Sequence, residues 1–239
     1  MSQNKSRTPS LQNATAWSAL KEDRSRYGLI QTLTGRIAWK IDSALGIQIY
    51  RIGLRNLNAA QMESRPWPPG IRVKILSSEE LRLAALDPDL DLPPDLVEDS
   101  ISAEDVVVGA FKDDLLVSYV FATTETAPHD EVFCVKTQKP YRYSFKSFTR
   151  EEYRGQGISY YTNNLPARNL VFKERGCTDS VFFIAPWNLP SLQANTKLRG
   201  CSWIGWAVNL RVRGRPYSFR TRAVQKTGFL FSPRMNSPK

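Results

Sequence analysis

Hydrophobic residues recur along the chain with two different periods, which together predict helices and strands. Over residues 26–50, apolar side chains recur every three or four residues, which predicts an amphipathic helix that ends at Gly46. Its apolar stripe consists of Ile30, Leu33, Ile37, Ile41, Ala44 and Leu45. Arg36 and Lys40 lie beside this stripe, so two interpretations stay open. The helix packs on its own domain, or it lies on an anionic membrane surface.

Apolar runs and alternating residues farther along the chain predict strands. Residues 106–111 and 115–121 are apolar runs on either side of Lys112-Asp113-Asp114, which indicates a hairpin. Residues 141–148 alternate as a long aromatic strand, and residues 181–184 form a fully apolar strand suited to the centre of a sheet. Further strands are predicted at 71–75, 131–135, 203–212 and 216–224.

Helical patterns separate these strands. They cover residues 78–86, 158–175 and 190–198, and a capping motif starts the first of them. The acidic, proline-containing stretch 87–99 predicts an irregular loop. This order of elements predicts a mixed α/β sheet.

The 239-residue chain has a formal net charge of +10, which is unevenly distributed. Residues 1–70 carry ten basic and four acidic groups (+6), and residues 77–131 carry two basic and fifteen acidic groups (−13). Residues 132–239 carry nineteen basic and four acidic groups (+15). This asymmetry indicates two sites of opposite preference and disfavours a protein that coats nucleic acid nonspecifically.

Composition narrows the classes of protein further. Hydrophobic residues make up 41% of the chain, which excludes wholesale disorder. No apolar run approaches the roughly 20 residues of a membrane-spanning helix, and the N-terminus has no signal-peptide pattern. Three widely spaced cysteines and a single histidine, His129, argue against a disulfide framework and a metal centre. We therefore expect a cytoplasmic protein without a bound metal.

The sequence around residues 148–159, FTREEYRGQGIS, carries the clearest chemical signal. Gly155 and Gly157 lie where the aromatic strand ends and a helix begins. Glycines let the backbone turn and approach a ligand closely, so this turn can hold a pyrophosphate. The alternative is an ordinary strand-to-helix turn.

This turn and a second segment together resemble the GNAT superfamily of acyl-CoA N-acyltransferases. In that family a turn of the type Gln/Arg-x-x-Gly-x-Gly/Ala binds the pyrophosphate of coenzyme A, and residues 152–157 match it except at Glu152. The second segment, APWNLPSLQANTKLRGC, matches with Asn188, Ser191, Lys197 and Gly200. The resemblance covers roughly residues 70–210. It implies an α/β fold with a mostly antiparallel central sheet and flanking helices, beside the N-terminal amphipathic helix.

The resemblance also implies where each part of coenzyme A binds. The implied cofactor-binding residues are Ser147, Thr149, Arg154, Gly155, Gln156, Gly157, Ile158, Ser159, Asn188, Ser191 and Lys197. Composition, periodicity and the resemblance together divide the chain into a flexible tail (1–25), a helical extension with a linker (26–69), an acyltransferase domain (70–225) and a C-terminal tail (226–239).

The catalytic groups are less clear from the sequence. The family often has a tyrosine seven positions after the asparagine, as the acid that protonates the thiolate, but this chain has Asn195 there. His129 is the only side chain with an unperturbed pKa near neutrality, so it is a candidate base. Glu131, Tyr141 and Tyr143 are further candidates, and we select His129 and Tyr143. The alternative to a catalytic role is that His129 is an exposed loop residue and that the tyrosines only pack in the sheet.

We therefore predict an N-acyltransferase that moves an acetyl or other acyl group from acetyl-CoA or another acyl-CoA to the primary amine of a small molecule. The amine attacks directly in a ternary complex. The alternatives are the same fold with acyl carrier protein as the donor, and a non-enzymatic basic module that binds nucleic acid. Peripheral contact with a membrane through residues 26–50 stays open, as does the oligomeric state.

Overall fold

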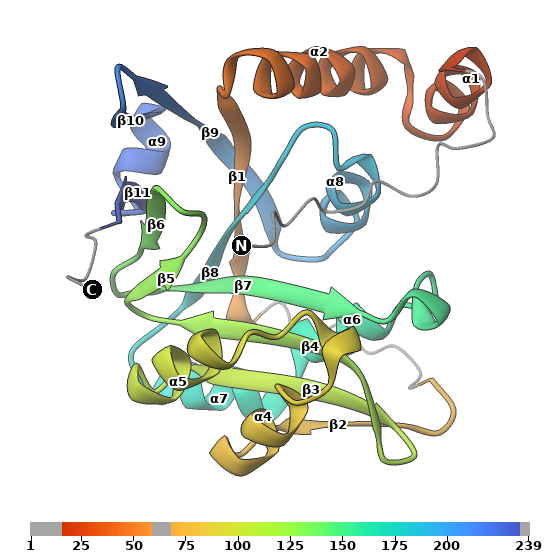
Figure 1. Ribbon diagram of the computed structural model, residues 1–239, viewed down its shortest axis with the longest axis vertical. Helices are drawn as coiled ribbons and strands as arrows, with labels where there is room; N and C mark the ends of the chain where they lie inside the picture. Colours follow the sequence, from red (N-terminus) through yellow and green to blue (C-terminus); the bar gives the residue numbers. More distant parts are fainter. Residues whose placement is uncertain (1–15, 59–67, 235–239) are drawn as a thin grey trace.

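The computed structural model describes residues 16–58 and 68–234, with side chains from residue 22 onward. A twisted eight-stranded sheet runs through the molecule (Figure 1). Its strand order is β10 (Arg215–Arg220), β9 (Cys201–Val212), β1 (Gln48–Asn56), β8 (Asp179–Ile184), β7 (Tyr141–Thr149), β4 (Leu115–Thr123), β3 (Val106–Lys112) and β2 (Ile71–Ile75). Neighbouring strands are antiparallel except β7 and β8, which are parallel. The predicted mixed, mostly antiparallel sheet with flanking helices is confirmed.

Helices cover both faces of this sheet, which explains why the central strands are almost continuously apolar. On β4, Tyr119 and Phe121 pack with α4 (Ser78–Ala84), η1 (Pro88–Leu90) and α5 (Pro94–Ser102) on one face. On the other face, Val120 packs with Leu165, which lies between α6 (Ile158–Asn164) and α7 (Pro166–Glu174), and Ala122 packs with Phe172 of α7. A three-stranded sheet, β11 (Leu230–Pro233), β6 (Phe133–Lys136) and β5 (Thr126–Pro128), adds Phe133 and its neighbours to the first face.

The N-terminal segment differs from the sequence prediction. The region predicted as one helix over 26–50 is α2 (Leu29–Leu45), and α1 (Ala16–Tyr27) begins inside the predicted tail. Residues 48–56 form β1, which lies between β8 and β9, so the extension supplies a central strand. Gly46, with φ +64, ends α2 and turns the chain into the sheet. The predicted linker lies largely outside the described residues.

Four further predictions differ from the structure. The strand predicted over 216–224 ends at Arg220 as β10, and α9 (Arg222–Gln225) follows it. The single helix predicted over 158–175 is divided into α6 and α7, because Pro166 lacks an amide hydrogen and disfavours helical geometry at Leu165. The acidic stretch predicted as a loop contains α5, where Pro94 occupies the first helical position. The predicted C-terminal tail contains β11, which pairs with β6.

Helix α2 docks through small residues and not through its apolar stripe. Its buried residues are Thr32, Gly35 and Ala38. A Cβ on Gly35 would lie 2.9 Å from the carbonyl oxygen of Pro186, so only glycine allows this close approach. The stripe that includes Ile30 and Ile37 stays exposed.

Candidate functional site

Strands β7 and β8 part in the middle of the central sheet. They pair only where Tyr141–Tyr143 lies beside Asp179–Val181. Beyond Tyr143 and Val181 the two strands diverge, and the backbone groups on their facing edges have no strand partner. A cavity of about 720 Å³ lies here and is lined by both strands. The parting therefore creates a site with unpaired main-chain donors and acceptors along its walls.

A β-bulge shapes the β7 wall of the cavity. The register between β4 and β7 shifts around Lys146 and Ser147, and Lys146 has a positive φ of +42°. Bulges bend a strand and turn side chains away from their regular direction. Both residues line the cavity, and Lys146 Nζ lies 2.7 Å from Asp91 Oδ2.

The glycine turn closes one end of the site. Gly155 and Gly157 have φ values of +79° and +76°, in the left-handed region that favours glycine. A Cβ at either position would meet no atom within 4 Å, so the chain leaves the surface of the turn open. Arg154 and Tyr160 use their amides inside the turn, whereas in the described part of the chain the amides of 155–159 find no backbone acceptor. These amides can hold a phosphate group.

A buried arginine holds the start of this turn. Arg150 donates from Nε to the carbonyl oxygen of Leu116 at 2.8 Å, and its guanidinium forms an ion pair with Asp87. Within the turn, Arg154 Nε donates to the carbonyl oxygen of Thr149 at 3.1 Å. Part of the acidic stretch therefore supports the turn, which is a structural role.

Helix α8 (Leu189–Thr196) forms the wall on the β8 side. Asn188 caps this helix, because its Oδ1 accepts a hydrogen bond from the Ser191 amide at 3.3 Å. Asn188, Ser191, Asn195 and Lys197 all line the cavity. Asn195 Nδ2 donates to the carbonyl oxygen of Ser191 at 2.9 Å. An asparagine thus faces the cavity at the position where the family often has a tyrosine.

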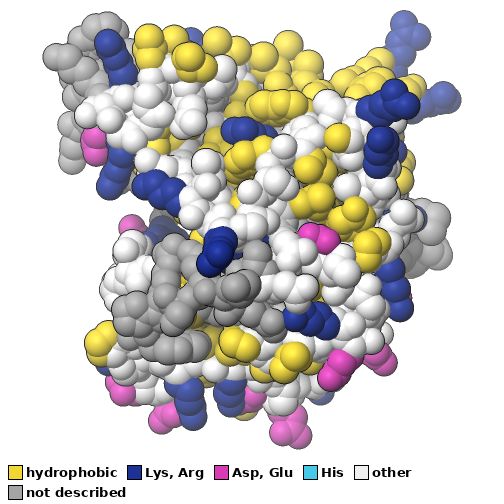
Figure 2. All heavy atoms as spheres, turned by 180° about the vertical axis from the view of Figure 1, so that it is seen from behind, with side chains coloured by type: hydrophobic (Ala, Val, Ile, Leu, Met, Phe, Trp, Pro, Cys, Tyr) yellow, Lys and Arg dark blue, Asp and Glu magenta, His cyan; other side chains and the backbone are white. Residues whose placement is uncertain are grey.

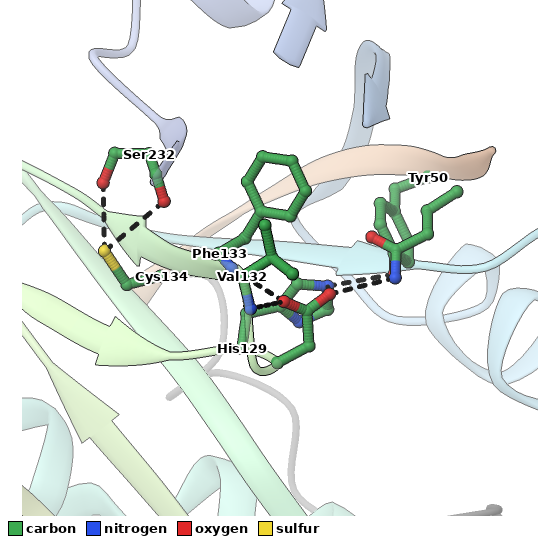
Figure 3. Close-up of polar contacts among 8 residues, drawn as sticks. Tyr50, His129, Val132, Phe133, Cys134 and Ser232 are labelled. Carbon is green, nitrogen blue, oxygen red and sulfur yellow. Dashed lines mark hydrogen bonds and ion pairs between the residues drawn. The ribbon is translucent and has the colours of Figure 1, made fainter. Parts of the chain in front are cut away.

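A tyrosine–histidine pair lies beside the point where β7 and β8 part. Tyr50 of β1 lines the cavity, and its hydroxyl lies 3.0 Å from Nε2 of His129, in the turn between β5 and β6 (Figure 3). Asp130 Oδ2 lies 4.0 Å from the same nitrogen and accepts a hydrogen bond from Gln48 Nε2. Tyr50 therefore lines the cavity, and one hydrogen bond connects it to His129, which lies behind it.

Burial sets the protonation of these groups. It lowers the pKa of His129 below its usual range, and the nearby Asp130 opposes this only in part, so the imidazole is neutral at pH 7. Burial raises the pKa of Tyr50 and of Tyr143, so both hydroxyls stay protonated. The rings of Phe183 and Phe231, each 5.1 Å from the His129 ring, complete this apolar surrounding.

The structure places the sequence-predicted residues in two groups. Those that line the cavity are Tyr143, Ser147, Gly157, Ser159, Asn188, Ser191 and Lys197. Those outside its lining are His129, Thr149, Arg154, Gly155, Gln156 and Ile158. The Ile158 side chain is buried in the core with Ala110 and Val117, so only its backbone is available to a ligand. His129 reaches the cavity through Tyr50.

Sequence reasoning did not find several residues of the site. Tyr50 is the last residue of the range 26–50, for which only a helix ending at Gly46 was predicted, and nothing in its neighbourhood indicates a partner 79 positions away. Arg142 and Ser144, which are polar positions within the aromatic strand 141–148, also line the cavity. The alternation of side chains along that strand places both residues on the face opposite Tyr143, and this pattern is the sequence signal that could have indicated them.

Two classes of site are not found among the described residues. They contain no cluster of three or more metal-ligating side chains of the His, Cys, Asp and Glu types. Within the same residues, no helix has the length and apolar character needed to cross a bilayer.

Comparison with known proteins finds solved structures that resemble part of this chain. No family model and no curated protein matches the sequence. The chain is similar to a functionally unknown conserved protein from Staphylococcus epidermidis (12% identity, TM-score 0.45, covering 71% of this chain and 63% of that chain). It is also similar to a GCN5-related N-acetyltransferase from Kribbella flavida (15% identity, TM-score 0.39, covering 66% of this chain and 54% of that chain). A tandem GNAT protein from the clavulanic acid biosynthesis pathway is a further similar structure (14% identity, TM-score 0.45, covering 70% of this chain and 57% of that chain). Each match spans less than two thirds of the other chain.

Proposed function

We propose that the protein is an N-acyltransferase that transfers an acyl group from coenzyme A to a primary amine. The observation that carries this proposal is a continuous cavity that runs from Gly157 of the glycine turn to Tyr50 and Tyr143. It joins an open phosphate cradle to buried proton-transfer groups through a gap between two strands. Of the two motifs that resemble the GNAT superfamily, Gly157 of the first and Asn188, Ser191 and Lys197 of the second line this cavity.

The residues present fit coenzyme A along the length of this gap. The open backbone at Gly155 and Gly157 suits a pyrophosphate, which needs close approach to main-chain amides. From Thr149 back to Tyr143, β7 extends for about 20 Å. Along this edge the unpaired backbone groups suit the amides of the pantetheine arm, in the manner of an added strand. Ser191 and Lys197 line the other wall.

The chemistry takes place where the strands meet. The amine nitrogen forms a bond to the thioester carbon, and the bond from that carbon to sulfur breaks. A proton of the amine passes to the Tyr50 oxygen while the Tyr50 proton passes to Nε2 of His129. The resulting imidazolium lies near the carboxylate of Asp130, which stabilises it.

Tyr143 acts as a hydrogen-bond donor in this proposal and not as the acid. An ordinary thiol has a pKa of about 8.5, whereas burial raises the pKa of Tyr143 above that of a free tyrosine. The hydroxyl therefore keeps its proton, and it stabilises charge that develops on the reacting group. The thiolate leaves unprotonated and takes its proton from water.

Binding and turnover test this function separately. We expect coenzyme A and acetyl-CoA to raise the melting temperature of the protein by several degrees, because only the folded state binds them. A panel of primary amines should then release free thiol from an acyl-CoA. Acyl carrier protein loaded with the same acyl group is the second donor. Turnover with the carrier protein alone would contradict the coenzyme A donor, and no stabilisation by any coenzyme A species would contradict the whole proposal.

A further inference from the structure

A group of buried arginines lies beside the part of the cavity where β7 and β8 begin to diverge. Arg142 of β7 and Arg168 of α7 are 2% and 0% exposed, and Arg55 of β1 is 7% exposed. Arg55 and Arg142 line the cavity, and Arg168 NH2 donates to the hydroxyl of Ser144, another lining residue, at 2.8 Å. Three guanidinium groups therefore share one small buried region of the protein.

Two of these arginines have no acidic partner in the described part of the chain. Arg168 donates to carbonyl oxygens at the end of α6, at Thr162 and Asn163, and its Nε has no acceptor. Arg142 has no acceptor at Nε or at NH1, and its guanidinium lies 4.9 Å from the ring centre of Phe172. Packing and carbonyl contacts leave the positive charge of both groups uncompensated.

Burying a charge without a counter-charge is costly, so such groups are normally paired. Burial, together with the neighbouring Arg168, lowers the pKa of Arg142 well below its usual range. An anion in the cavity would remove this cost. Arg142 and Tyr143 both line the cavity where β7 and β8 part. Their side chains lie on opposite faces of the sheet at this same end of the cavity.

We propose that this arginine cluster, Arg55, Arg142 and Arg168, binds a carboxylate that belongs to one of the two substrates, the acyl donor or the amine acceptor. Guanidinium groups form strong charge-assisted hydrogen bonds to carboxylates. A dicarboxylic acyl group whose thioester lies near Tyr143 would place its free end here, and an amino acid acceptor would place its carboxylate here. This inference rests on the proposed function, because it assumes that an acyl thioester binds between β7 and β8.

Binding to matched donors tests the donor source. Calorimetry would compare dicarboxylic acyl-CoA esters of three to five carbons with monocarboxylic esters of the same length. If the donor carries the carboxylate, we expect one dicarboxylic ester to bind at least tenfold more tightly. Arg142→Met should remove this preference, and the exposed Arg215→Met should keep it.

Thiol release tests whether the amine acceptor carries the carboxylate. Rates with amino acids are compared with rates with the corresponding amino acid amides at a fixed acetyl-CoA concentration. A preference of at least tenfold for the carboxylate form, lost in Arg142→Met, would support the site there. A wild-type protein that binds coenzyme A but shows no carboxylate preference in either arm would overturn the carboxylate site alone. The wild-type comparison needs no variant, so it decides even if Arg142→Met fails to fold. No binding of any coenzyme A ester would contradict the proposed function as well.

A second and independent observation concerns the molecular surface. Fourteen large hydrophobic side chains are exposed among the described residues, and ten of them lie in α2 or in the β9–β10 hairpin. These ten, which we call the apolar rim, are Leu29, Ile30, Leu33, Ile37, Trp39, Leu45, Trp206, Val212, Tyr217 and Phe219. Figure 2 shows hydrophobic side chains gathered along the top of the molecule, over these elements.

Basic residues border the apolar rim. Arg211, Arg213 and Arg215 are exposed at the tip of the β9–β10 hairpin, and Lys40 is exposed on α2. Residues 180–239 contain ten Lys and Arg and no Asp or Glu. Exposed apolar side chains bordered by basic residues are typical of a surface that binds an anionic membrane. The apolar side chains contact acyl chains, and the basic side chains contact the negatively charged headgroups.

We propose that the apolar rim docks on an anionic membrane surface. Apolar side chains of α2 would enter the boundary between headgroups and acyl chains, while the arginines of the hairpin would contact phosphates. The small-residue contacts of α2 with the body of the protein stay in place, because Thr32, Gly35 and Ala38 lie on the side of the helix away from Ile30 and Ile37.

Flotation with vesicles tests this proposal. We expect the protein to float with vesicles of 70% phosphatidylcholine and 30% phosphatidylserine, and at least tenfold less with phosphatidylcholine alone or in high salt. Ile30→Glu with Ile37→Glu should reduce the bound fraction at least tenfold. The matched control is Leu83→Glu with Leu86→Glu, because those side chains, in α4 and just after it, are similarly exposed and lie away from the rim. The proposal is overturned if the wild-type protein floats with neither kind of vesicle. It is also overturned if the wild-type protein forms a stable dimer in ultracentrifugation and the Ile30→Glu, Ile37→Glu variant is a monomer.

Discussion

Replacing Gly157 by valine is expected to weaken coenzyme A binding at least about 100-fold, equivalent to about 2.7 kcal/mol. At φ +76° a β-branched residue is strained, and its methyl groups would occupy the open surface on which the pyrophosphate lies. Isothermal calorimetry with coenzyme A measures the loss, and circular dichroism measures the melting temperature of the variant.

Gly214 offers a matched control for this experiment. It lies in the turn between β9 and β10 with φ +79°, and a Cβ there would also meet no atom within 4 Å. Gly214→Val should therefore lose a similar amount of stability, about 1–2 kcal/mol for the left-handed backbone, and keep its affinity for coenzyme A. Unchanged binding by Gly157→Val would show that the turn does not hold the phosphates.

The Tyr50→Phe variant is expected to lower kcat by about 10²- to 10³-fold and leave the affinity for coenzyme A within twofold. The substitution removes the hydroxyl that joins the cavity to His129, and general acid–base groups commonly contribute a factor of this size. The phenyl ring keeps its packing against Phe231. Tyr217→Phe, at an exposed position, serves as the control and should retain full activity.

The pH profile shows whether His129 receives the proton. Burial lowers its pKa below 6.5, so the imidazole accepts a proton at neutral pH and loses that capacity as the pH falls through the lowered pKa. In the wild type, kcat/KM should rise with pH through a value below 6.5 and then level off. His129→Gln keeps a hydrogen-bonding side chain but cannot titrate, so this rise should disappear. A variant with a wild-type rate and profile would exclude the relay.

The two proposals on the cavity complement each other. The glycine turn and the arginine cluster lie at opposite ends of β7, and the tyrosine–histidine pair lies near the second end. A donor with a carboxylate on its acyl group would be held at both ends, which positions the thioester between them. Such two-point binding favours attack by restricting the motion of the reacting groups.

Local patterns in the sequence predicted those parts of the fold that depend on neighbours in the chain. The hairpin at Asp113, the aromatic strand over 141–149 and the glycine turn each depend on residues a few positions apart. Errors arose where a local signal was incomplete. The helical range 26–50 was drawn past the stop signal at Gly46 into residues that become β1, and Pro166 divided a helix that the apolar pattern had joined.

The sequence by itself determined that the chain forms a mixed α/β sheet, that a glycine turn follows the aromatic strand, and where the charge blocks lie. Only the tertiary structure decided that β1 enters the centre of the sheet, and this placement brings Tyr50 to His129 and Arg55 to Arg142. The physical reason is that periodicity specifies which side chains point inward, whereas the pairing of distant strands specifies which of those side chains meet.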